Sequence, residues 1–210
     1  GMNQAVRNAN DAISMMQTAD AAAGGITDVL FRMRELSVQA TNGTNSTADK
    51  TALQTEFASL QAEITRISDK TTWNGTYLIG ASAGAVTFQI GADSGATLTM
   101  TTLDLDAATG MATVVAAAAT VADSASITKI DSAIEAINDF RADMGAKINR
   151  LQYTTDNLTN VSTNTSASRS RILDADYGAA TSQLARAQIV MQAGTAMLAQ
   201  ANQQPAFVLA

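Results

Sequence analysis

Few side chains in this sequence could carry out catalysis. The 210 residues include no His and no Cys, so neither a Ser–His or Cys–His pair nor an imidazole or thiolate metal site can form. No remaining side chain titrates near neutrality at its ordinary pKa. Only carboxylates, Lys, Arg and Tyr are left as candidate catalysts. We therefore expect no catalytic residue, no metal and no cofactor.

Two short patterns with possible chemistry have simpler structural interpretations. Asp174 and Asp176 could be a metal-binding or acid pair, but no third ligand is nearby and Tyr177 follows. A cap at the break between two helices fits them better. Gly91 and Gly95 lack the following Lys-Ser/Thr of a phosphate-binding loop.

The charge and hydropathy patterns exclude two classes of partner. The net charge is -6, and the Lys and Arg residues are scattered singly, whereas nucleic-acid-binding domains normally show a basic stripe. No run of about 18 uninterrupted apolar residues occurs, so we predict neither a nucleic acid nor a membrane as partner. No signal peptide is visible. Because Gly1-Met2 precedes a helix already under way, we expect the natural N-terminus to lie upstream.

The first part of the chain predicts two antiparallel helices, residues 3–41 and 47–70. Apolar residues recur at steps of three and four through the first helix, as on one helical stripe. Asn42-Gly43 is typical of a turn, and Ser46 or Thr47 can cap the second helix. The second helix has the seam spacing of a coiled coil, carried by Leu53, Phe57, Leu60, Ile64 and Ile67.

The middle of the chain, residues 72–125, has a different period. Apolar residues alternate with polar ones from Val86 to Ile90, and again among the threonines around Leu98 and Met100. Glycines lie between these runs, which predicts a β-hairpin. Residues 106–125 are rich in Ala and Thr and are expected to form a loop, with helix as the open alternative.

The strongest helical periodicity runs through residues 126–172, and Ser124 or Ser126 can cap this helix. Heptad spacing is kept by Ile127, Ile130, Ile134, Ile137, Met144, Ile148, Leu151 and Leu158, with Arg141 and Thr155 as polar exceptions. A helix of this length would be roughly 68 Å long. We therefore predict a mainly α protein, an elongated rod of long antiparallel coiled-coil-like helices with a small β-hairpin region. Leu53, Leu60, Ile134 and Ile148 are expected to form the buried helix seam.

The final segment, residues 176–210, has no charged residue after Arg186. The amide side chains argue against a membrane helix, while a modest apolar face is supplied by Leu184, Ile189, Met191, Met197 and Leu198. Such a helix suits packing among copies of itself, where a buried charge would be costly. A disordered tail is the alternative.

Several stretches together resemble the bacterial flagellins. RNANDAISMMQTADAAAGG and MRELSVQATNGTNS resemble their N-terminal helical region, and SASRSRILDADYGAATSQLARAQIVMQAGTAMLAQANQQP resembles their C-terminal region. FQIGADSG, residues 88–95, resembles the hairpin of their rod domain. The resemblance covers residues 3–80 and 126–210 closely.

The resemblance implies a structural subunit of the flagellar filament, secreted to the cell exterior for motility. It implies a rod domain at residues 1–175 and a C-terminal helix of the filament's inner core at 176–210. The helix that precedes the rod in the family and the large outer variable domains are absent, so the chain is expected to be an N-terminally truncated short form. Other flagellin subunits, an export chaperone and a filament cap protein are the implied partners.

The resemblance also marks a contact patch at Arg32, Leu36 and Glu56. In the family this patch takes part in subunit contacts and is read by the flagellin-sensing Toll-like receptor. The residue before Arg32 is Phe31, where the family commonly has Gln. Arg32 and Glu35 one turn apart could equally be an ordinary surface pair.

Two other classes of function stay open at this point. One is a cell-surface protein that binds a polysaccharide on a coiled-coil stalk, against which the single Trp counts. The other is an enzyme, which the missing His and Cys make the weakest interpretation.

Overall fold

The computed structural model describes residues 1–80, 82–103, 114, 120–173 and 176–208, with side chains up to residue 201. The chain divides into two compact units, Gly1–Ser162 and Thr163–Ala210, and this division falls inside a helix. The boundary expected at residue 175 stays a prediction.

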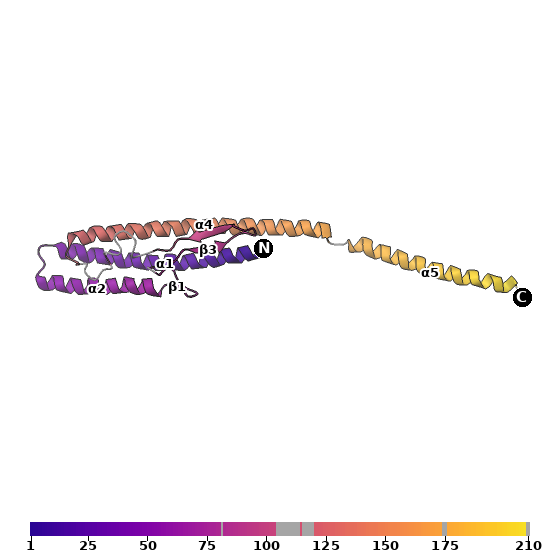
Figure 1. The fold of residues 1–210 in the computed structure, drawn as a ribbon, viewed down its shortest axis with the longest axis horizontal. Coiled ribbons are helices and arrows are strands. Elements are labelled where there is room, and N and C mark those ends of the chain that lie inside the picture. The colour runs from indigo at the N-terminus through magenta and orange to yellow at the C-terminus, as the bar shows by residue number, and fades with distance from the viewer. Residues whose placement is uncertain (81, 104–113, 115–119, 174–175, 209–210) are drawn as a thin grey trace. The chain divides into compact units, whose positions relative to one another are not determined.

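The first unit is built from three long helices that lie side by side (Figure 1). Helix α1 spans Met2–Thr41, α2 spans Thr47–Lys70, and α4 spans Ser124–Leu173. A short turn reverses the chain between α1 and α2. Helix α4 also runs antiparallel to α1, because Asp131 pairs with Arg34 while the later Arg141 pairs with the earlier Asp20. The predicted fold class of long antiparallel helices with a small hairpin region is confirmed.

The core of this unit lies along the inner stripe of α1. Small and large apolar residues alternate there, and Ala9, Met16, Ala23, Leu30 and Leu36 are all fully buried. Alanine at these steps lets neighbouring helices approach closely, and the larger side chains fill the space between them. Phe57 and Ile64 of α2 and Ile130 and Ile137 of α4 complete the same cluster.

Two antiparallel strand pairs form the β region. Strands β1 (Thr72–Trp73) and β2 (Thr76–Tyr77) enclose a tight turn whose residues Asn74 and Gly75 both have positive φ. This geometry is that of a type I′ hairpin turn, which the Asn-Gly dipeptide favours.

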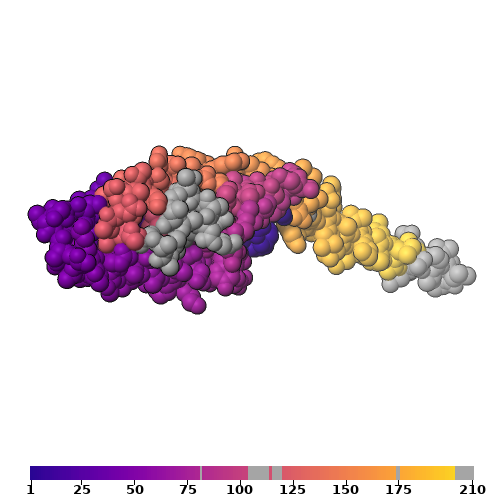
Figure 2. Space-filling view, turned by 60° about the vertical axis from the view of Figure 1, so that its left-hand side comes forward, coloured from indigo at the N-terminus to yellow at the C-terminus, as the bar shows by residue number. Residues whose placement is uncertain are grey.

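The second strand pair is the predicted hairpin. Strands β3 (Val86–Gln89) and β4 (Thr97–Met100) pair Val86 with Met100 and Phe88 with Leu98. The hairpin is tied to α1 by the Asn8 side-chain amide, which donates to the Gln89 carbonyl at 3.0 Å. Figure 2 shows these residues, in magenta, beside the helices of their unit on the drawn face.

Helix caps agree with the sequence at one site and differ at another. Ser46 caps α2 in a capping box with Asp49, as predicted. At the start of α4, the Asp123 carboxylate accepts from the Ala125 amide at 2.9 Å, so the cap expected from Ser124 or Ser126 is wrong. The Ser126 hydroxyl instead donates to the Thr120 carbonyl. Residues 104–113 and 115–119 lie outside the described residues. They include most of the stretch 106–125, for which a loop or a helix was expected.

The last element is helix α5, Tyr177–Val208. The Asp176 carboxylate accepts from the Ala179 amide at 3.1 Å, which is the capping role predicted for it. Asp174 lies outside the described residues. The final segment therefore contains a helix over Tyr177–Val208.

Candidate contact surfaces

Arg32 lies between two carboxylates on the outer surface of α1 and α2. Its guanidinium donates from Nε to Glu56 at 2.8 Å and from Nη1 to Glu35 at 3.0 Å. The pKa of the Arg32 guanidinium is raised above its ordinary value, first by the hydrogen bond that it donates to Glu56 and then by the one that it donates to Glu35. Side chains of Arg32 and Glu56 are 49% and 44% exposed, so water screens the pair and it adds little to stability.

Leu36 does not join this surface, and its expected exposure is wrong. Its side chain is fully buried, together with Met33 and Ala40 on the inner stripe of α1. The antiparallel pairing places Glu56 level with Arg32 instead, one helical turn before Leu36. The apolar residues that α1 exposes outward are Phe31 and Val38, about half exposed. Seven residues apart, they share one face.

The four predicted seam residues all contact the core, to different extents. Ile134 is buried, whereas Leu53, Leu60 and Ile148 are half-buried and pack against the buried cluster. The same spacing includes more deeply buried positions, among them Phe57, Ile64, Ile130 and Ile137, so spacing alone does not rank the residues by burial.

Polar side chains of α2 fix the chain that leads into α4, a role that sequence reasoning missed. The buried Gln61 side chain donates from Nε2 to the Val114 carbonyl at 2.6 Å. Seven residues earlier, the Gln54 side chain accepts from the Val121 amide at 2.7 Å. Glutamines seven residues apart on a helix share one face, which is the only sequence signal that could have suggested such a pair.

Helix α5 is exposed along the part whose side chains the structure describes. Every described side chain from Tyr177 to Ala201 is exposed, including six large apolar ones that are 59–71% exposed. These are Leu184, Ile189, Val190, Met191, Met197 and Leu198. The unit thus displays a long apolar surface that its own described residues do not cover.

The α5 surface contains a regular heptad seam. Large residues recur every seven positions at Tyr177, Leu184, Met191 and Leu198, and small ones recur between them. The small residues are Ala180, Ala187, Gly194 and Ala201. Alternating steps of three and four that keep one line of apolar residues are the pattern of a coiled-coil seam. Small residues along it would let a second helix approach closely.

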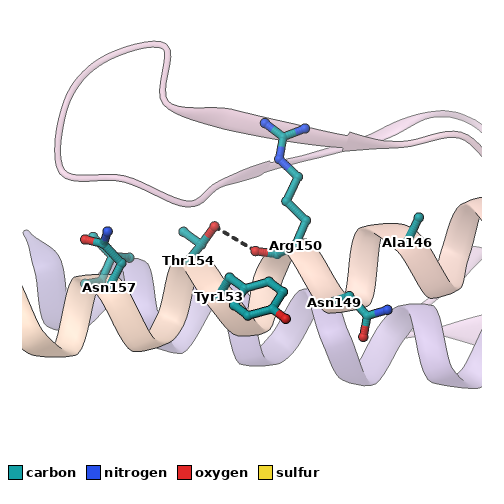
Figure 3. A pocket seen from close by; sticks show the side chains of 7 residues that line it. Ala146, Asn149, Arg150, Tyr153, Thr154 and Asn157 are labelled. Atoms are coloured by element: carbon teal, nitrogen blue, oxygen red, sulfur yellow. Dashed lines mark hydrogen bonds between the residues drawn. The ribbon is translucent and has the colours of Figure 1, made fainter.

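A shallow open groove runs along α4 in the first unit. Its described lining residues all come from α4, between Ala146 and Leu158. Arg150 extends from the helix in the direction of the hairpin, while the Thr154 hydroxyl bonds the Arg150 carbonyl at 2.8 Å (Figure 3). Tyr153 is the only aromatic side chain in this lining. One helix face with one aromatic ring is a poor platform for a sugar, so the groove gives the polysaccharide-binding alternative little support.

Features of other protein classes are missing from the described part of the chain. No group of three or more acidic side chains there could hold a metal ion. None of the helices, as far as they are described, is long and apolar enough to cross a membrane. Long helices, one of which exposes an apolar seam, are typical of structural proteins that associate through helix packing.

Comparison with known proteins agrees with this class. Residues 1–83 match the bacterial flagellin N-terminal helical region, and residues 127–210 match the bacterial flagellin C-terminal helical region. A flagellin of Halalkalibacterium halodurans is 43% identical over 212 residues, covering 100% of this chain and 78% of the relative. The flagellar filament 33 kDa core protein of Treponema phagedenis is 36% identical over 225 residues, covering 100% of this chain and 79% of the relative.

Solved structures give the same result. The crystal structure of Bacillus cereus flagellin superposes with a TM-score of 0.65 at 37% identity, covering 78% of this chain and 94% of that chain. The chain therefore belongs to the bacterial flagellin family. It is a structural subunit of the flagellar filament, and the flagellins are structural proteins and not enzymes.

Proposed function

We propose that this subunit polymerises into a helical tube through the heptad seam of α5. The observation that supports the proposal is the uncovered seam itself, in which Leu184 and Leu198 are 59% and 63% exposed. An exposed apolar surface of this kind is unfavourable in water and becomes favourable once a second helix covers it. The partner is another subunit of the same kind.

The chemistry of α5 also fits burial among copies. No charged residue follows Arg186, so most of the helix can leave water without the penalty of desolvating a charge. The amide side chain of Gln188 lies beside the seam and can hydrogen-bond at its rim, while Gln192 and Gln200 lie on the far side of the helix. A contact of one face with a different face of the next copy gives a helical assembly when the rotation between copies does not close into a ring.

A matched pair of substitutions tests the seam. Leu184→Asn introduces an amide into the seam, and Ala185→Asn introduces the same amide one residue away, outside it. Both should alter the intrinsic helix stability of α5 in similar ways. Seeded polymerisation of the natural subunit, released from filaments by heating, should be strongly reduced by Leu184→Asn and largely retained by Ala185→Asn. Equal polymerisation of the two variants would mean that the seam does not form the contact between subunits.

We further infer that the outer surface around Arg32 and Glu56 contributes to contacts between the first units of neighbouring subunits. Its charged groups are exposed, and Phe31 and Val38 add apolar area on the same helix. The flagellin-sensing Toll-like receptor is a second proposed partner of this surface. An export chaperone, a filament cap protein and a location outside the cell also follow from family membership as proposals.

Charge reversal tests this second surface. Glu56→Arg should reduce receptor binding and filament yield while leaving the melting temperature nearly unchanged, because Glu56 is exposed. Arg66→Glu is a suitable control, since Arg66 is an exposed cation elsewhere on the unit that pairs with Glu63 within α2. Loss of binding in the control but not in Glu56→Arg would mean that another surface makes the contact.

A further inference from the structure

The methionines of this chain fall into two groups by exposure. Met15 is 3% exposed, and Met16, Met33, Met100 and Met144 are 0% exposed, all in the core of the first unit. Met191 and Met197 of α5 are 66% and 71% exposed. Of the other two, Met2 is half-buried at the N-terminus and Met111 lies outside the described residues.

Exposure decides which thioether an oxidant reaches. A peroxide or hypochlorous acid transfers one oxygen atom to the methionine sulfur, whose lone pair forms the new S–O bond. The sulfur is oxidised by two electrons to a sulfoxide, while hydrogen peroxide is reduced to water or hypochlorous acid to chloride. The sulfoxide can be reduced enzymatically, by one enzyme for each epimer. On the free subunit, Met191 and Met197 are therefore the described sites most open to this reaction.

The two exposed methionines occupy different places on α5. Met191 lies in the heptad seam, seven residues from both Leu184 and Leu198 and three from Gly194. Met197 lies next to the seam residue Leu198, off the line that the seam follows. Oxidation of both should be similar, whereas its effect on helix packing should differ.

We propose that Met191 is a reversible oxidation site that controls whether α5 can pack, an inference that rests on the proposed function of the seam. The sulfoxide oxygen is a strong hydrogen-bond acceptor. The seam neighbours of Met191 are Leu184, Ala187, Gly194 and Leu198, which offer no side-chain donor. Burying the oxidised side chain there leaves its oxygen without a hydrogen-bond donor from the seam residues, which is costly.

Assembly should protect the same residue. A seam covered by a second helix excludes water and dissolved oxidant from the Met191 sulfur. Oxidation then acts on the free subunit before it joins the filament and has little effect on subunits already assembled.

The test uses the natural subunit, released from filaments by heating. It is treated with hydrogen peroxide, and peptide mass spectrometry measures sulfoxide at Met191, Met197 and Met144. We expect sulfoxide at the first two and little at Met144. Seeded polymerisation of the treated subunit should show a critical concentration raised about tenfold or more, as for a weakened binding equilibrium. Treatment with both methionine sulfoxide reductases should restore the original value.

Two variants separate the seam methionine from its neighbour. Met191→Leu keeps the side-chain volume and should polymerise as the parent does, before and after peroxide. Met197→Leu should stay as sensitive to peroxide as the parent. Protection by Met197→Leu instead, or normal polymerisation of a parent fully oxidised at Met191, would overturn the proposal. If the untreated parent failed to polymerise, and Leu184→Asn had no further effect, the proposed function would be the part in error.

Discussion

Arg141 of α4 donates from Nε to the Asp20 carboxylate of α1 at 2.9 Å. This ion pair occupies the point where the apolar repeat of α4 is interrupted, between Ile137 and Met144. Together with the pair of Arg34 and Asp131 at 2.6 Å, it fixes how far α4 is shifted along α1. A shift of α4 along α1 by one heptad would still place apolar residues against apolar residues. It would break both ion pairs.

The pair itself should contribute modestly to stability. Arg141 and Asp20 side chains are 40% and 38% exposed, so Asp20→Ala should lower the free energy of unfolding by about 0.2–1 kcal/mol. Urea unfolding of the two single variants and of the double variant with Arg141→Ala gives the coupling energy. Strict additivity of the single changes would show that the pair contributes no coupling energy.

Leu36→Ala should be far more destabilising than any change at Arg32 or Glu56. Leu36 is fully buried, and truncation of a buried leucine costs about 2–5 kcal/mol. Thermal melting checks this, with Glu56→Ala as the exposed control. A reduced receptor signal in Leu36→Ala would then reflect a weakened fold and not a lost contact. A melting temperature equal to that of the parent would instead mean that the Leu36 side chain is exposed in solution.

Ser46→Ala should destabilise α2 at its first turn. The Ser46 hydroxyl accepts from the Asp49 amide, and the Asp49 carboxylate accepts from the Ser46 amide. Loss of such a cap costs about 1 kcal/mol, which lowers the melting temperature of a chain of this size by about 2–4 °C. Thr47→Ala is the control, since Thr47 does not act as the cap. A larger loss in the control would mean that the helix begins one residue later in solution.

The same cap predicts a dependence on pH. Hydrogen bonds from the Ser46 side chain, and then from its backbone amide, hold the pKa of Asp49 below its ordinary value. A carboxylate with a lowered pKa in the folded state stabilises the fold fully above the unfolded pKa of about 3.9 and loses this effect as the pH falls through its folded pKa. Ser46→Ala should therefore flatten the pH dependence of stability below about pH 4. Parallel curves for parent and variant in that range would assign the dependence to other carboxylates.

The sequence could predict the helices better than the contacts between them. The stripe from Ala9 to Leu36 and the seven-residue repeat from Ile130 to Leu151 define faces, and those faces are the buried ones. The axial alignment of one helix against the next depends on pairs such as Arg32 with Glu56. Neither helix alone shows which of its residues will be paired in this way. Leu36 lies on the buried stripe that the periodicity defines, and only the family resemblance placed it in the contact patch.

Two further features were hidden from sequence reasoning for physical reasons. Asp123 caps α4 although two serines nearby have equal capping propensity, because the preceding loop decides which side chain reaches the free amide. Gln54 and Gln61 reach partners more than fifty residues away, and a glutamine on a helix gives no sign of whether it bonds water or a distant carbonyl.

Electron cryomicroscopy of filaments from the natural subunit would show whether α5 assembles through its heptad seam. We expect density in which Leu184, Met191 and Leu198 face a second helix, with Gly194 at the point of closest approach between the two. A filament in which these side chains face water, while the opposite side of α5 around Ala185 and Gln192 makes the contact, would contradict it.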